Sequence, residues 1–129
     1  MLLERAHFEV VGEVDDGDAA VRMVEALQPD ILILDRAMPK LDGLEVAREI
    51  SRRPEHPQMI LLTVYVAAYH VLAGIERGIR GFVAKNDAAD ELLTAVNAVS
   101  DGQTFLSTSA VRAMYEAHLT LPRTPMHGA

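Results

Sequence analysis

D-I-L-I-L-D-R-A-M-P-K-L-D-G, residues 30–43, combines a continuous apolar run with an abrupt polar end at Asp35. Such a run is typical of a strand buried on both faces of a parallel sheet. In open parallel sheets, ligands bind outside the carboxyl ends of the strands. The stretch therefore predicts a carboxylate at a ligand-binding edge, although a solvated aspartate that merely ends a strand is the simpler alternative.

Strands and helices alternate along the rest of the chain. Apolar runs predict strands at 59–62 and 82–84, and a more polar run predicts an edge strand at 8–14. The helical spacing of apolar residues predicts helices at 18–28, 43–53, 66–77, 88–100 and 107–119. This alternation predicts an α/β fold in which a parallel sheet lies between helices on both faces, giving three layers.

The composition limits the classes of protein to consider. A chain of 129 residues suits one domain, which we expect at residues 1–119, and the proline-containing residues 120–129 predict a disordered tail or the start of a linker. No apolar run is long enough for a membrane helix, and the absence of cysteine is compatible with a cytoplasmic location. The net charge of −7 argues against direct nucleic-acid contact by this segment.

Two further polar residues follow predicted strands. Thr63 ends M-I-L-L-T and Lys85 ends G-F-V-A-K, so both are expected at the same sheet edge as Asp35. Taken singly, Thr63 fits a turn and Lys85 fits a solvated surface. Together, a carboxylate, a hydroxyl and an ammonium suit the transfer of a phosphoryl group to the carboxylate, because the phosphoryl oxygens need donors and positive charge.

The motif D-x-x-M-P-x-x-D-G is formed by Asp35, Met38, Pro39, Asp42 and Gly43. With Thr63, Lys85 and Phe82 downstream, it resembles the response-regulator receiver domain of two-component signalling, in the branch that usually carries a LuxR-type helix-turn-helix. The resemblance runs from about residue 8 to 109 and implies a flavodoxin-like fold. Phe82, three residues before Lys85, matches the switch aromatic of that family, although a core aromatic is the simpler interpretation.

The resemblance also implies roles for these residues. Asp35 would be the phosphoacceptor and a Mg²⁺ ligand, and Ala37 would lend Mg²⁺ a backbone carbonyl. Thr63 and Lys85 would hold the phosphoryl group, which a sensor histidine kinase would supply. Phe82 would then change rotamer, and the surface of residues 66–101 would switch a partner or dimer contact that controls transcription. Such a domain is not an enzyme beyond weak self-catalysed phosphotransfer or dephosphorylation.

The start of the chain departs from the family. Receiver domains normally begin with a central strand that ends in two acidic residues, followed by a helix, and residues 1–7 here look like only the last turn of that helix. The acidic pair is absent from any matching position, and the doublet Asp15–Asp16 fits a turn. Asp35 alone predicts a weak, largely hydrated Mg²⁺ site and slow phosphotransfer.

A missing central strand would leave backbone hydrogen bonds unmade. Two hypotheses address this gap: residues 8–14 pair with residues 31–34, or a second copy supplies a strand in an exchanged homodimer. Past about residue 120, where the branch would carry its DNA-binding domain, only a short tail remains, so the chain is expected to be a fragment or a truncated product.

Two other functions remain open. The chain could be a receiver-like module that takes no phosphate and mediates dimerisation or protein interaction through residues 66–101. It could also be a hydrolase built on Asp35 with His56 or His70, although no motif places either histidine.

Overall fold

The computed structural model of the protein describes residues 2–4, 9–12, 17–35 and 43–118. Within these residues, six strands form one sheet in the order β2-β1-β3-β4-β5-β6. The strands are β1 (Leu2–Glu4), β2 (Glu9–Gly12), β3 (Ile31–Asp35), β4 (Gln58–Thr63), β5 (Ile79–Ala84) and β6 (Phe105–Leu106). The strands from β3 to β6 are parallel to one another, which confirms the predicted parallel α/β sheet.

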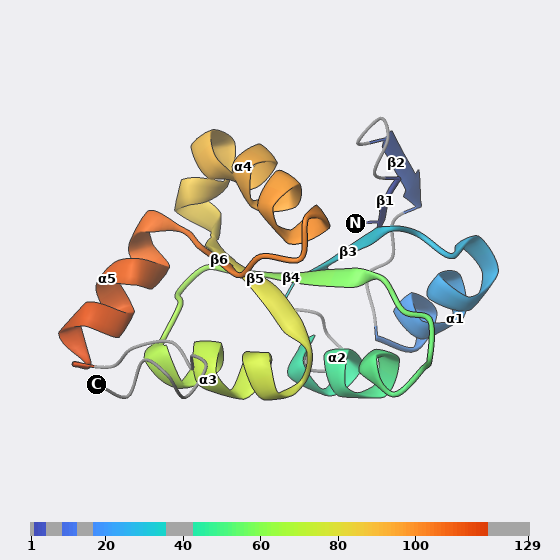
Figure 1. The fold of residues 1–129 in the computed structure, drawn as a ribbon, viewed down its shortest axis with the longest axis horizontal. Helices are drawn as coiled ribbons and strands as arrows, with labels where there is room; N and C mark the ends of the chain where they lie inside the picture. Colours follow the sequence, from blue (N-terminus) through green and yellow to red (C-terminus); the bar gives the residue numbers. More distant parts are fainter. Residues whose placement is uncertain (1, 5–8, 13–16, 36–42, 119–129) are drawn as a thin grey trace.

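Helices cover both faces of the sheet, as the sequence predicted. They are α1 (Gly17–Leu27), α2 (Gly43–Ser51), α3 (Ala68–Glu76), α4 (Ala88–Ser100) and α5 (Thr108–Glu116), with a 3₁₀ helix, η1 (Lys85–Asp87), before α4. Figure 1 shows α1, α2 and α3 along one face and α4 on the other. Gly78 and Gly102, just beyond the ends of α3 and α4, have positive φ angles of 91° and 81°. Such a glycine is a common helix terminator.

The core consists of two apolar clusters, one on each face of the sheet. The larger joins Leu32, Leu34, Leu61 and Phe82 to apolar residues of α1, α2, α3 and α5. The smaller joins Ile31, Ile33, Ile60 and Val83 to α4. Because successive side chains of a strand point to opposite faces, a strand covered on both faces must be apolar throughout. This requirement explains the uninterrupted run in β3.

The N-terminal strands correct the expectation for the start of the chain. Residues 2–4 form a strand rather than a helical turn, and β1 runs antiparallel to β3, with Leu2 opposite Leu32 and Leu3 opposite Ile31. β2 pairs with β1 and not with β3, so the predicted shift of residues 8–14 onto 31–34 is wrong, although their edge position is confirmed. Main-chain groups of β3 need partners, and Leu2 and Leu3 supply them for Leu32 and Ile31 within one chain, so this part of β3 requires no exchanged strand.

The C-terminal part adds a strand that the sequence did not predict. β6 pairs in parallel with β5, with Phe82 opposite Leu106, and the helix predicted at 107–119 is confirmed as α5. The proposed tail at 120–129 and the doublet Asp15–Asp16 lie outside the described residues.

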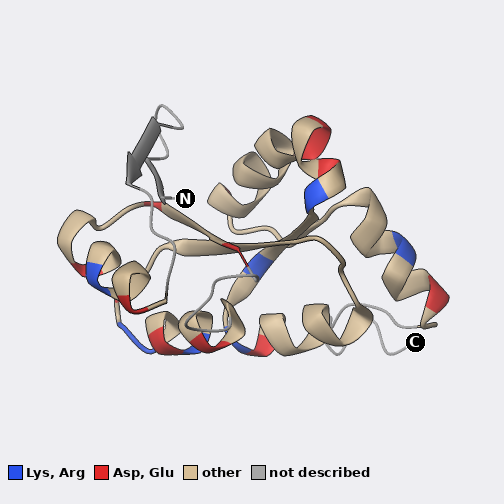
Figure 2. Ribbon diagram, turned by 180° about the vertical axis from the view of Figure 1, so that it is seen from behind, with Lys and Arg blue, Asp and Glu red and all other residues tan. Residues whose placement is uncertain are grey.

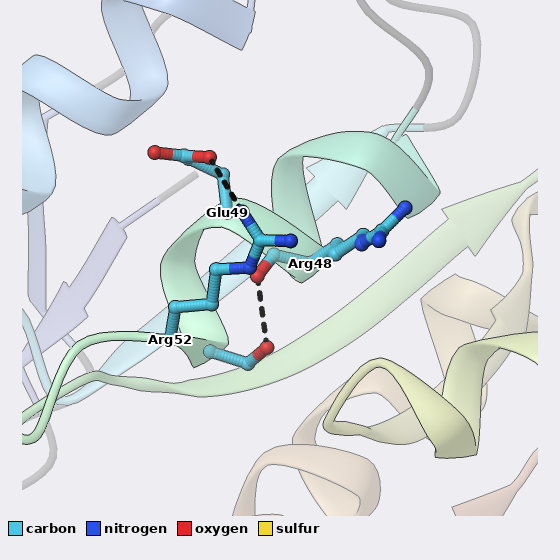
Figure 3. Close-up of polar contacts among 4 residues, drawn as sticks. Arg48, Glu49 and Arg52 are labelled. Carbon is cyan, nitrogen blue, oxygen red and sulfur yellow. Dashed lines mark hydrogen bonds and ion pairs between the residues drawn. The ribbon is translucent and has the colours of Figure 1, made fainter.

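The outer surface of α2 carries both signs of charge. Arg52 lies 4.0 Å from Glu49, with both side chains more than half exposed, and the Ser51 hydroxyl donates to the main-chain carbonyl of Arg48 (Figure 3). Figure 2 shows acidic residues at the start of α4, where Asp90 and Glu91 lie. Among the helices of the described residues, none combines the length and apolar character of a membrane span.

Candidate functional site

The carboxyl ends of three neighbouring strands bring the predicted site residues to one edge. Asp35 is the last residue of β3, Thr63 is the last residue of β4, and Lys85 directly follows β5. The parallel register pairs Asp35 with Leu62 and Thr63 with Ala84, so Thr63 lies one residue further along the sheet than Asp35, and Lys85 lies one residue further than Thr63. β4 lies between the other two strands.

Lys85 and Asp35 are in direct contact. The Lys85 Nζ atom lies 2.8 Å from Asp35 Oδ2, and the two side chains are 36% and 44% exposed. Because neighbouring strands are about 4.8 Å apart, β3 and β5 are separated by roughly twice that distance, and only a long side chain can cross the end of β4. The pair therefore presents a carboxylate oxygen and a positive charge to solvent at the same point.

Thr63 ends the intervening strand and is buried, with 5% of its surface exposed. Its hydroxyl donates a hydrogen bond of 3.2 Å to the main-chain carbonyl of Tyr65, two residues further on. The structure thus places Thr63 at the predicted edge with its proton directed to its own loop. Tyr65 itself is 73% exposed.

Phe82 is fully buried in the larger core cluster. Its ring lies against α3: a Cβ atom placed on Gly74 would come within 2.5 Å of Phe82 Cε1. In this state Phe82 is a core aromatic, and a glycine on the facing helix provides the space for its ring. Its role as a switch stays a prediction.

The remaining predicted loop residues are described only in part. Gly43 is buried at the start of α2. Ala37, Met38, Pro39 and Asp42 lie outside the described residues. No group of three or more acidic, histidine or cysteine side chains suited to a metal ion occurs in the described part of the chain. Among the described residues, Asp35 is the one predicted Mg²⁺ ligand.

A cluster of acidic residues next to Lys85, which the sequence did not predict, holds the start of α5. Asp87 accepts a hydrogen bond of 2.9 Å from the Ser109 main-chain N–H, and Glu91 accepts from the Thr108 N–H. The bond from the Ser109 main chain is the main reason why the pKa of Asp87 is lowered, and Ser107, Ser109 and Arg112 also lower it, against a smaller opposing effect of burial.

Ser107 explains why this cluster was hard to predict. S-T-S at 107–109 has the sequence of a helix that caps itself through Ser107. The Ser107 side chain makes no such bond, and its hydroxyl instead accepts a hydrogen bond of 3.1 Å from the Ala84 N–H. The acidic residues that follow Lys85 in the sequence were the available signal that side chains from outside α5 cap its first turn.

Neither histidine of the hydrolase alternative supports that reading. His56 precedes β4 and therefore lies at the opposite end of the strands from Asp35, and its Nδ1 is 3.0 Å from the Pro57 carbonyl oxygen. His70 is buried in α3, where its Nδ1 accepts a hydrogen bond from the Ala67 N–H.

Comparison with known protein families identifies the family to which this fold and site belong. The family described as "Response regulator receiver domain" matches residues 1–97. The chain belongs to this family. The match begins at residue 1, so it includes the segment that forms β1 and β2.

Curated relatives of this receiver domain are transcriptional regulators. It is 30% identical over 109 residues to the transcriptional regulatory protein YdfI of Bacillus subtilis, covering 84% of this chain and 51% of YdfI. It is 35% identical over 95 residues to LiaR of the same organism, covering 74% of this chain and 45% of LiaR. The chain thus spans about half the length of these relatives.

Solved structures agree with the fold. A LuxR-family two-component response regulator from Aurantimonas sp. SI85-9A1 superimposes with a TM-score of 0.79 at 27% identity, over 84% of this chain and 78% of that one. The isolated receiver domain of RcsB from Salmonella enterica serovar Typhimurium, solved with the phosphomimetic BeF₃⁻, gives 0.72 at 30% identity, over 81% and 78%. The resemblance to the LuxR-type branch is thereby confirmed.

Proposed function

We propose that this receiver domain accepts a phosphoryl group on Asp35 from a sensor histidine kinase and passes that signal on to transcription. The contact between Lys85 Nζ and Asp35 Oδ2, 2.8 Å long at the carboxyl ends of parallel strands, carries the proposal. An exposed carboxylate oxygen can attack phosphorus, and an adjacent ammonium can stabilise the charge on the phosphoryl oxygens. The family membership and the transcriptional relatives support the same reading.

The transfer is an in-line displacement. An Asp35 oxygen forms a bond to phosphorus while the phosphorus–nitrogen bond of the donor phosphohistidine breaks, and the released imidazole takes up a proton. The Lys85 ammonium then pairs with the oxygens of the phosphoryl group bound to Asp35. The Thr63 hydroxyl must leave the Tyr65 carbonyl before it can donate to one of these oxygens. That exchange of partners is the proposed first step of switching.

Mg²⁺ fits this site as a weakly held ion. Asp35, the Ala37 carbonyl and the incoming phosphate would each supply an oxygen ligand and water the rest, since Mg²⁺ sites commonly use only one or two carboxylates. When bound, the ion offsets negative charge on the phosphoryl oxygens. Phosphotransfer should therefore be slow and depend on millimolar rather than micromolar Mg²⁺.

The proposed output is a change at the surface of residues 66–101, with Phe82 as the buried link. Phe82 belongs to β5, the strand that leads to Lys85, and its ring lies against Gly74 of α3. Movement at the end of β5 would therefore reach α3 through the ring. RcsB, a neighbour in structure, has been solved in complex with DNA. For this chain we propose homodimer formation and transcriptional control from the cytoplasm, and no enzymatic role beyond slow self-catalysed phosphotransfer.

A receiver-like interaction module that takes no phosphate is the second candidate. The observation that favours it is that the described residues contain no group of three or more side chains suited to a metal ion. In that case Lys85 and Asp35 would remain a structural ion pair.

Intact-mass measurement after incubation with acetyl phosphate and Mg²⁺ separates the two candidates. We expect the mass of one phosphoryl group to be added to the wild type, no addition to Asp35→Asn, and loss of the addition with EDTA. Asp90→Asn is the matched control, because it removes an exposed acid from α4 and should behave as the wild type. An unmodified wild type, or equal modification of Asp35→Asn, would overturn the proposal.

A further inference from the structure

The 3₁₀ helix η1 connects the candidate phosphate site to α5. Lys85, its first residue, contacts Asp35, and Asp87, its last, accepts the hydrogen bond from the Ser109 main chain. Only one residue separates the lysine from the aspartate. The two side chains therefore project from the same short, hydrogen-bonded turn.

The start of α5 depends on acceptors from outside the helix. The first N–H groups of any helix lack partners within it. Ser107, at the usual capping position, has its hydroxyl engaged by the Ala84 N–H. Glu91 of α4 accepts from Thr108 at 3.1 and 3.2 Å, and Asp87 accepts from Ser109 at 2.9 Å. Both acceptors are carboxylates, which also interact favourably with the positive end of the helix dipole.

The segment before α5 is fixed to the same strand end. The Ser107 main-chain N–H donates to the Phe82 carbonyl at 2.9 Å, and Ser107 is fully buried. β6 pairs with β5 immediately before it. The residue before α5 is thus fixed to β5. The carboxylates of Asp87 and Glu91 then hold the first turn of α5.

A groove of about 220 Å³ separates α5 from the connection that follows Thr63. Tyr65 and Ala84 line it on the sheet side, and Arg112 and Glu116 line it on α5. On the sheet side, the Tyr65 carbonyl accepts the hydrogen bond from Thr63, and Ala84 directly precedes Lys85. On the α5 side, Ser109 also lines the groove and donates to Asp87.

We propose that Asp87 is a positioning residue that couples occupancy of the Asp35–Lys85 site to the order of α5. An anion bound at Asp35 holds Lys85, which fixes η1, and η1 then holds the first turn of α5 more firmly through Asp87. The output surface of the domain accordingly extends beyond residue 101 to α5. This inference rests on the proposed function, because it requires an anion at Asp35.

Hydrogen–deuterium exchange of the whole chain, with and without beryllofluoride and Mg²⁺, tests the coupling. In the wild type, beryllofluoride should change exchange in residues 63–66 and should slow exchange of the first-turn amides of α5 by about fivefold, the factor that a typical helix cap contributes. In Asp87→Ala, the response at 63–66 should persist while the response in α5 is lost. Asp87→Asn keeps an oxygen acceptor and should restore part of it.

Asp90→Ala is the matched control, because Asp90 is an exposed acid three residues further along the chain. It should respond like the wild type at both places. A response at 63–66 without any response in α5, or an unchanged α5 response in Asp87→Ala, overturns the coupling and leaves the phosphate site intact. No response at 63–66 in the wild type overturns the proposed function and the coupling with it. If Asp87→Ala does not fold, Asp87→Asn decides the same question, because its response in α5 should be smaller than that of the wild type while the response at 63–66 persists.

Discussion

Lys85 and Asp35 illustrate how a contact can matter for function more than for folding. More than a third of each side chain is exposed, and ion pairs in water typically stabilise a protein by less than about 1 kcal/mol. The same exposure leaves the carboxylate open to a phosphoryl donor. At the scale of single residues, we therefore expect that removing Lys85 has a large effect on phosphotransfer and a small effect on stability.

Lys85→Ala should slow phosphorylation by acetyl phosphate about 100-fold, because a preorganised group that stabilises developing charge is removed. Its free energy of unfolding in urea should change by less than about 1 kcal/mol. Arg80→Ala is the control, since Arg80 is an exposed cation on the same strand. Equal phosphorylation rates for Lys85→Ala and the wild type would show that Lys85 has no part in the chemistry.

Asp87 predicts a pH dependence of stability. Because its pKa in the folded protein is lowered from the ordinary value of 3.8, the carboxylate stabilises the fold above that value. This contribution is lost as the pH falls through the lower, folded pKa. The stability difference between the wild type and Asp87→Ala should therefore shrink between pH 5 and the acid limit, measured by urea unfolding at each pH. A difference that stays constant or grows on acidification contradicts this.

At the scale of helices and strands, long apolar patterns predicted structure well and short segments did not. The runs at 31–34 and 59–62 and the helix at 88–100 lie where the sequence placed them, because each must fill a face of the core. β1 and β6 are too short to have a pattern of their own. They form because an open strand beside them offers unpaired main-chain groups, which the sequence of the short strand does not reveal.

The same distinction holds for the candidate site. Asp35, Thr63 and Lys85 could be predicted, because polar residues that end apolar runs fall on one edge of a parallel sheet. The bond from Thr63 to Tyr65 and the caps from Asp87 depend on loop geometry, and S-T-S suggests the wrong capping group.

The packing of the Phe82 ring against α3 gives a prediction for the contact between β5 and α3. Gly74→Ala should destabilise the protein by about 1–3 kcal/mol despite the better helix propensity of alanine, because the new methyl group meets the Phe82 ring. Phe82→Leu should cost less in the Gly74→Ala background than in the wild type, as measured by a double-mutant cycle in urea. Strictly additive effects would mean that the ring and α3 do not compete for this space.

At the scale of the whole molecule, β1 completes the sheet. It lies between β2 and β3, so the strand order 2-1-3-4-5 expected of a flavodoxin-like fold is kept, with an antiparallel strand in the second place. This strand has only three residues: all of them pair with β2, and Leu2 and Leu3 also pair with β3.

Deletion of residues 1–4 should lower the free energy of unfolding by at least about 2 kcal/mol, since several main-chain hydrogen bonds of β3 and β2 lose their partners. An open edge should also promote association at higher concentration. Urea unfolding and light scattering over a range of concentrations measure the two effects. An unchanged midpoint together with an unchanged mass would show that β1 contributes little to the sheet.

The central claim is that the carboxylate of Asp35, beside Lys85, accepts the phosphoryl group. Borohydride reduction after treatment with acetyl phosphate converts an aspartyl phosphate to homoserine, which peptide mass spectrometry can locate. We expect homoserine at position 35 and at no other acidic residue. Homoserine at another carboxylate, or none at any position after prolonged treatment with Mg²⁺, would contradict the account.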